Sequence, residues 1–222
     1  MEQVRKFHNF SKKTLIQNFA RKGQYVLDVG CGFGGDLKKW SDCGVILDAC
    51  DPLEESLVEA RSRAQTLGLV HTRFFHGDIL ACPERVYDII CYNFSLHYIF
   101  QSRDLFFKSI RAIRARLRKG CRLIGYIPDS ESILMSTPFK DPLGNFITRT
   151  NVTGYGAFGE KIFVCLADTP FYKDGARAEP IAYKDLLITH LEELGVQLES
   201  WEPLIGEHAI SSLYSRFIFV CK

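Results

Sequence analysis

The sequence lacks several features that would place a protein in a class at once. It has no run of about 18 consecutive apolar residues, so no membrane-spanning helix is expected. Its first residues, MEQVRKFHNFSKK, do not have the pattern of a signal peptide, and no repeat or low-complexity segment occurs. The formal net charge is only +2, so overall charge does not indicate a nucleic-acid partner, although it allows a local basic patch.

Metal-binding and disulfide patterns are absent as well. The eight cysteines form no Cys-x-x-Cys pair and no zinc-type spacing. Several of them, such as Cys50, Cys91 and Cys165, lie inside apolar runs. We therefore expect small buried thiols in a reducing compartment.

A glycine-rich stretch, VLDVGCGFGGDLKKW, is the most informative part of the chain. A short apolar strand ends at Val29, four glycines follow between Gly30 and Gly35, and a helical segment opens at Asp36. Glycines allow a sharp turn and the close approach of a ligand, and a helix start offers unpaired N–H groups. The pattern predicts one edge of a nucleotide pocket, but a plain glycine-rich turn has the same sequence.

The glycine spacing also satisfies the dinucleotide fingerprint, so a nicotinamide enzyme is one alternative. That fingerprint requires an acidic residue at the end of the next strand, and Asp51 supplies it. A carboxylate there can accept both hydroxyls of an adenosine ribose. Both NAD and S-adenosylmethionine carry that ribose, so Asp51 does not choose between them. No recognisable proton-donor set for a nicotinamide enzyme follows the fourth strand.

Apolar runs of strand type alternate with helical segments along the chain. We expect strands at 26–29, 45–51, 71–76, 87–92, 122–127, 196–201 and 214–221, and helices at 12–21, 36–42, 53–67, 102–117 and 182–194. Ser11 is expected to cap the first helix. With 222 residues, 46% of them hydrophobic, this order predicts one α/β domain with a doubly wound, Rossmann-like sheet.

The pattern changes after the fifth strand. Residues 136–180 are rich in Gly, Pro, Thr and Asp, with a strand-like segment at 161–166, and we expect an insertion with small antiparallel strands of its own. The last two strands are joined without a crossover helix, so the last strand is expected to be antiparallel in an otherwise parallel sheet.

Polar residues mark the ends of four expected strands: Gly30 in its turn, Asp51, Asp78 and Asn93. Ligands bind at the carboxyl ends of strands in such folds. Asp78 and Asn93 could each be a simple turn former or cap, but four markers at successive strand ends favour a pocket. The aromatic segment after Asn93 contains His97 and Tyr98, which suit a planar base or a cation.

Three segments together resemble the mRNA cap guanine-N7 methyltransferase family: FHNFSKKTLI, VLDVGCGFGGDLKKW and CYNFSLHYIF. The glycine motif of that family reads GCGKGGDL-x-KW, and its fourth-strand segment ends in a His-Tyr pair. The resemblance extends from about Val4 to Cys221 and implies the S-adenosylmethionine-dependent methyltransferase fold over residues 1–222. It implies that residues 1–24 form a helical segment contributing to both sites and that 136–180 form an insertion or lid.

The resemblance assigns roles residue by residue. The positions implied for S-adenosylmethionine, and for its product S-adenosylhomocysteine, are Lys12, Gly30, Asp51, Asp78, Asn93 and Tyr98. The positions implied for the 5′-capped RNA are Asn9, Lys39, Arg63, His97, Glu179 and Tyr214. Lys39 and Arg63 match basic positions that face the cap triphosphate, although as helix charges they could equally be solvated. Asn93 stands where the family often has Gln.

Two positions depart from the family pattern. Phe33 replaces the lysine of GCGKGG, which removes one phosphate-facing charge. His8 stands where the family has the first of two asparagines, so only Asn9 is carried over.

The resemblance implies in-line transfer of a methyl group to guanine N7 without a general base or a metal, with Tyr98 and Glu179 as positioning groups. It suggests the C-terminal domain of a multidomain capping enzyme, linked to triphosphatase and guanylyltransferase domains, from a large cytoplasmic DNA virus. Two alternatives remain open: a small-molecule S-adenosylmethionine-dependent methyltransferase, and a non-catalytic methyltransferase-like capping subunit. A cytoplasmic location and no membrane association are expected.

Overall fold

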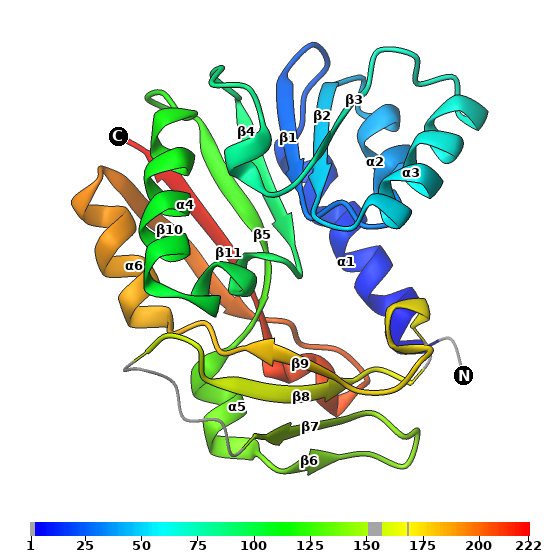
Figure 1. Cartoon of the computed structure of the whole chain (residues 1–222), viewed down its shortest axis with the longest axis vertical. Coiled ribbons are helices and arrows are strands. Elements are labelled where there is room, and N and C mark those ends of the chain that lie inside the picture. The colour runs from blue at the N-terminus through cyan, green and yellow to red at the C-terminus, as the bar shows by residue number, and fades with distance from the viewer. Residues whose placement is uncertain (1–2, 151–156, 168) are drawn as a thin grey trace.

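The computed structural model describes residues 3–150, 157–167 and 169–222 (Figure 1). A seven-stranded sheet forms its centre, with the strand order β10-β11-β5-β4-β1-β2-β3. The strands are β1 (Tyr25–Val29), β2 (Ile46–Asp51), β3 (Arg73–His76), β4 (Ile89–Asn93), β5 (Arg122–Pro128), β10 (Val196–Pro203) and β11 (Tyr214–Cys221). The five strands from β1 to β5 run parallel, and β11 is antiparallel to both neighbours, as expected from the sequence.

Helices cover both faces of this sheet (Figure 1). They are α1 (Gln3–Phe19), α2 (Leu37–Asp42), α3 (Glu54–Thr66), α4 (Arg103–Ala115), α5 (Ser130–Ser136) and α6 (Lys184–Glu193). Alternate residues of β1 enter different cores, because Val26 packs with α1 and α2 whereas Leu27 packs with α4 and α6. The sheet is thus buried on both faces, which is why its parallel strands are nearly continuous apolar runs.

The insertion forms a second, four-stranded antiparallel sheet. Its order is β6 (Phe139–Lys140), β7 (Phe146–Arg149), β8 (Lys161–Cys165) and β9 (Arg177–Pro180). Figure 1 shows this sheet lying across the carboxyl ends of the large sheet, where β5 runs into α5. The expectation of small antiparallel strands is therefore confirmed for the described residues, and residues 151–156 and 168 of the insertion lie outside them.

Four short 3₁₀ helices complete the described elements. They are η1 (Ile79–Ala81), η2 (Leu96–Gln101), η3 (Pro170–Tyr172) and η4 (Ala209–Leu213). Of these, η2 follows β4 directly and lies against β9 of the small sheet. This contact joins the two sheets at the carboxyl edge.

The first helix begins earlier than expected. Ser11 was predicted to be its N-cap, but α1 starts at Gln3 and Ser11 lies in the middle of it. The Ser11 hydroxyl donates to the carbonyl of Phe7 at 2.9 Å, a bond that a helix interior allows and a cap does not need. The helix continues upstream because His8 and Val4 are buried about one and two turns before Ser11.

All eight cysteines are free, and five of them are buried. None of the helices in the described part of the chain is long and apolar enough to cross a membrane. The five buried cysteines, Cys50 and Cys91 among them, thus contribute to packing as small apolar side chains, whereas Cys165, which was expected to be buried, is only partly so.

Gly125 provides a test of the packing between the central strands. A Cβ at this position in β5 would lie 1.9 Å from the carbonyl oxygen of Tyr92 and 2.8 Å from Phe217. Gly125→Ala should therefore lower the free energy of unfolding by about 3 kcal/mol, measured by urea denaturation. Gly68→Ala is the matched control, because it has open space and only a positive φ, and it should cost about 1 kcal/mol. Equal losses in the two variants would contradict this account.

Candidate functional site

The glycine turn after β1 is held tightly against its neighbours. The N–H groups of Gly30 and Cys31 both donate to the carbonyl of Cys50 in β2. Gly30 has a φ of +76°, and a Cβ there would lie 2.4 Å from the Cβ of Ser95. A side chain at Gly30 is thus excluded both by conformation and by the chain that follows β4. A Cβ at Gly32, by contrast, would meet no described atom within 4 Å, so the turn is open on its outer side.

Asp51, at the end of β2, connects the second strand to this turn. One carboxylate oxygen accepts from the Gly32 N–H at 2.8 Å, and the other accepts from the Leu53 N–H at 2.9 Å. The side chain is buried and has a fixed orientation. The structure therefore brings Asp51 and the glycine turn together, as the sequence predicts.

The Asp36 carboxylate joins three elements, α1, α2 and β4, at one buried point. Its Oδ1 lies 3.0 Å from Nζ of Lys12 in α1 and 2.6 Å from Nζ of Lys39 in α2. Its Oδ2 accepts from the Nδ2 of Asn93 at the end of β4, at 3.0 Å. Burial raises the pKa of Asp36, but the two ammonium groups outweigh it and bring the pKa to about 2. Asp36 is thus a permanent anion that orients Lys12 and Asn93, two of the residues implied for the cofactor.

Asp28 lies beside this cluster, and its pKa is shifted in the opposite direction. Burial, together with the charge of Asp36, raises the pKa of Asp28 to about 7. The Nε1–H of Trp40 donates to its Oδ2 at 3.1 Å and opposes that rise. Two neighbouring buried carboxyls therefore have widely separated pKa values, because only Asp36 is in direct contact with the lysines.

Glu179 in β9 faces η2 across the junction between the two sheets. Its Oε1 accepts from the Tyr172 hydroxyl at 2.6 Å, and its Oε2 lies 3.1 Å from Nε2 of His97. Both Glu179 and His97 are almost fully buried. The His97 ring packs against the Tyr98 ring with 4.3 Å between centroids. Burial and the Glu179 charge raise the pKa of the Tyr98 phenol, which keeps it protonated.

An aromatic stack lies next to this group. The His8 ring stacks on Phe94 at 5.0 Å, and Phe94 stacks in turn on Tyr126 at 5.5 Å. Tyr214 meets both His8 and Phe94 edge-on. Phe94 adopts a φ of +62°, a strained conformation for a bulky residue, directly after Asn93. Such strain is held in place by the stack on both sides of the ring and is typical of binding sites.

Other sequence candidates are less closely tied to this region. Asp78 is the N-cap of η1 and accepts from the Leu80 N–H at 2.8 Å. Arg63 lies on α3, and its Nε is 2.8 Å from Glu59. Asn9 is half-buried on α1. The Lys39 ammonium donates to the Gly35 carbonyl as well as to Asp36. Both basic residues assigned to the cap triphosphate are thus paired with carboxylates.

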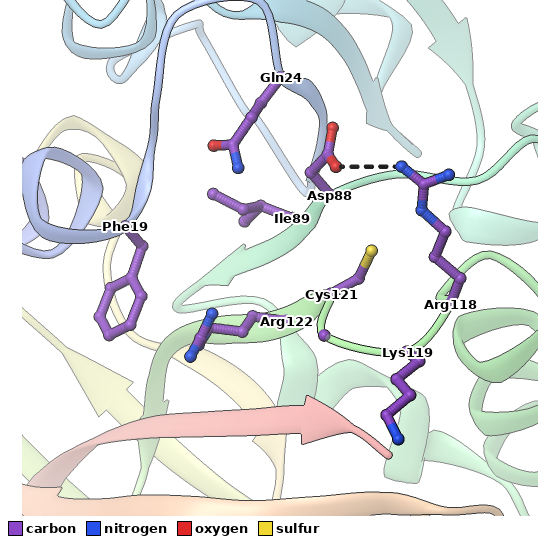
Figure 2. A pocket seen from close by; sticks show the side chains of 9 residues that line it. Phe19, Gln24, Asp88, Ile89, Arg118, Lys119, Cys121 and Arg122 are labelled. Atoms are coloured by element: carbon purple, nitrogen blue, oxygen red, sulfur yellow. Dashed lines mark ion pairs between the residues drawn. The ribbon is translucent and has the colours of Figure 1, made fainter.

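A hollow of about 250 Å³ lies elsewhere on the molecule, and Figure 2 shows the side chains that line it. Ile89 and Arg122 open β4 and β5, so this hollow is at the amino ends of the strands. Arg118 lies 3.8 Å from Asp88 there (Figure 2). Ligands of such folds bind at the carboxyl ends of the strands, so this hollow at the amino ends is separate from the candidate site.

Comparisons with known proteins show the family of this chain. The model of the mRNA (guanine-N(7))-methyltransferase domain matches residues 1–163. The chain belongs to this family. It is 31% identical over 165 residues to the mRNA cap guanine-N(7) methyltransferase of Schizosaccharomyces pombe, covering 66% of this chain and 46% of that protein. The corresponding protein of Aspergillus niger is 26% identical over 270 residues, covering 96% of this chain and 42% of its own length.

This member of the cap guanine-N7 methyltransferase family therefore spans less than half the length of these curated relatives. Solved structures show its fold. A protein of Pyrococcus horikoshii has a TM-score of 0.71 at 16% identity, covering 99% of this chain and 92% of that one. A glycopeptide N-methyltransferase complexed with S-adenosylmethionine has a TM-score of 0.65 at 13% identity, covering 97% and 94%. The fold is the Rossmann-like fold of S-adenosylmethionine-dependent methyltransferases.

Some residues of this family member's site are not evident from sequence alone. In the sequence Asp36 marks only a helix start, although its place directly after the glycine turn is a usable signal. Asp28 is hidden in the apolar run of β1. Tyr172 carries no signal, because nothing in its neighbourhood indicates that its hydroxyl meets Glu179.

The raised pKa of Asp28 predicts a pH-dependent stability. Its folded pKa of about 7 exceeds the unfolded value of 3.8, so its contribution is complete below pH 3.8 and is lost as the pH rises through 7. Asp28→Asn keeps an oxygen for Trp40 but cannot ionise. The free energy of unfolding of the wild type should therefore fall relative to Asp28→Asn between pH 5 and pH 8, measured by urea denaturation.

Asp42→Asn is the control for this experiment, because Asp42 is an exposed carboxylate paired with Lys38. It should follow the pH dependence of the wild type. If Asp28→Asn also runs parallel to the wild type, Asp28 is ionised throughout and the account is wrong.

Proposed function

We propose that this domain transfers the methyl group of S-adenosylmethionine to N7 of the terminal guanosine of GpppN-capped RNA. The observation that carries the proposal is the buried carboxylate of Glu179, held by Tyr172 and lying against His97 at the carboxyl edge of the sheet. A fixed carboxylate suits the N1–H and exocyclic amine of guanine, which adenine does not present in the same way. Family membership supports the same reaction.

The residues at the glycine turn fit the cofactor. The Oδ1 of Asn93 is a buried acceptor that has no partner among the described residues, so it suits an ammonium donor such as that of the methionine part. The open outer side of Gly32 leaves room beside the turn. In the proposal Asp51 receives the ribose, Asp78 lies at the adenine and Gly30 lies beneath the cofactor, while Lys12 and Tyr98 contact the methionine part.

The cap-binding half is proposed to include the aromatic stack. His97 and Tyr214 would surround the guanine with Glu179, and Asn9 would contact the cap on the α1 side. Lys39 and Arg63 are proposed for the triphosphate, which requires each to exchange its present carboxylate partner for a phosphate. Basic contacts of this kind make RNA binding salt-dependent.

The proposed mechanism is an in-line displacement without a general base. When bound, S-adenosylmethionine supplies a methyl group whose C–S bond breaks as the lone pair of guanine N7 attacks the carbon. S-adenosylhomocysteine leaves, and no proton is transferred. Glu179 and Tyr98 hold the base and the cofactor in line, which is the main source of the rate. The Glu179 carboxylate also favours the positive charge that develops on the guanine.

The proposal extends to the setting of the domain. Residues 1–222 are proposed to act as one domain, to which residues 1–24 contribute cofactor and cap contacts, and residues 136–180 form a cover over the site. Linkage to triphosphatase and guanylyltransferase domains, in a cytoplasmic capping enzyme of a large DNA virus, rests on the sequence resemblance. The relatives reported above are fungal.

The test separates the two halves of the site. Asp51→Ala should abolish binding of S-adenosylmethionine in calorimetric titration, because it removes the proposed ribose acceptor. Glu179→Gln should retain that binding, since Gln can still accept from Tyr172, but should lower N7 methylation of GpppA-ended RNA by about a hundredfold. The product is identified as 7-methylguanosine after nuclease digestion.

Wild-type protein that binds S-adenosylmethionine but gives no 7-methylguanosine would contradict the proposed reaction. That result would point to a small-molecule substrate. Wild-type protein that neither binds S-adenosylmethionine nor gives 7-methylguanosine would point to a non-catalytic capping subunit. Equal loss of cofactor binding in both variants would contradict the proposed division of the site.

A further inference from the structure

Arg177 shares a face of the small sheet with Glu179. In the β8–β9 pairing Val164 stands opposite Arg177 and Ile162 stands opposite Glu179. Cross-strand partners point to the same side of a sheet, and both Val164 and Ile162 are fully buried. The intervening Ala178 is exposed on the other side. Arg177 therefore projects from the inner face of β9, the face that presents Glu179 to the site.

The guanidinium of Arg177 is held in place but is not neutralised. It lies over the Phe171 ring, 4.2 Å from the centroid. Within the described ranges 3–150, 157–167 and 169–222 it has no ion pair, whereas Lys39 and Arg63 are each bound to a carboxylate. Stacking on an aromatic ring fixes the plane of the guanidinium while its N–H groups stay available to an anion.

Electrostatics place this cation beside the proposed substrate pocket. Burial and the Glu179 charge raise the pKa of Tyr98, and the Arg177 charge opposes them. Arg177 is thus within electrostatic range of the tyrosine that follows His97. Arg177 is the first residue of β9, two positions before Glu179. Figure 1 shows that this end of β9 is the one nearer to α1.

We propose that Arg177 binds the phosphate chain that links the cap guanosine to the RNA. This inference rests on the proposed function, because it takes Glu179 as the guanine contact. A guanine held by Glu179 then has its 5′-phosphates within reach of a cation on the same face of β9. Arg177 thereby supplies a phosphate-facing charge that Phe33 cannot provide and that needs no carboxylate to be displaced.

The test compares a ligand with phosphates to one without them. Binding of GTP and of guanosine is measured by calorimetry in the presence of S-adenosylhomocysteine, for the wild type, Arg177→Ala and Arg177→Lys. Arg177→Ala should weaken GTP binding about tenfold, equivalent to one charge-assisted hydrogen bond, and leave guanosine binding unchanged. Arg177→Lys should recover part of the loss, because it keeps the charge but not the planar stack.

Arg111→Ala is the matched control, since Arg111 is an exposed cation on α4. It should leave both affinities unchanged. Equal weakening of GTP and guanosine by Arg177→Ala, or no weakening of either, would overturn the inference. Equal affinities of the wild type for GTP and for guanosine would also overturn it. Failure of the proposed function is seen separately, as wild-type protein that does not methylate GpppA-ended RNA at N7.

Discussion

The candidate site depends on one buried anion. The Asp36 carboxylate joins α1, α2 and β4 through Lys12, Lys39 and Asn93. A buried carboxylate without partners would cost several kcal/mol, so its position is stable only while all three partners stay in place. Loss of any partner would therefore disturb residues that come from three separate parts of the chain.

The second sheet contributes Glu179 to the candidate site. The carboxyl edge of the large sheet carries the glycine turn, Asp51 and Asn93, which are proposed for the cofactor. Strand β9 brings Glu179 to that edge, where the Tyr172 hydroxyl donates to one of its oxygens and His97 Nε2 lies 3.1 Å from the other. The small sheet is anchored there by Ile147, Ile162 and Val164, which are fully buried in the core shared with the large sheet.

The sequence predicts the order of strands and the residues at their ends because both depend on local patterns. The glycine turn, Asp51 and Asn93 all lie at the carboxyl ends of strands, as the apolar runs before them predict. The pairings across the site were not predictable, because Asp36 and Lys12 are distant in sequence, and nothing local relates Tyr172 to Glu179. The start of α1 was missed for a similar reason: Val4 and His8 are buried by contacts made far along the chain, as in the 3.0 Å pair of His8 with Ser211.

His8 shows how a departure from the family pattern can be accommodated. Burial, with smaller effects of the Lys12 and His208 charges, lowers the pKa of His8 to about 4. The ring is therefore neutral at physiological pH and adds an uncharged aromatic surface to the stack with Phe94. A charged imidazolium at this point would repel both Lys12 and the positive charge that the proposed reaction places on guanine. A neutral ring instead lets Glu179 act on that charge without opposition from His8.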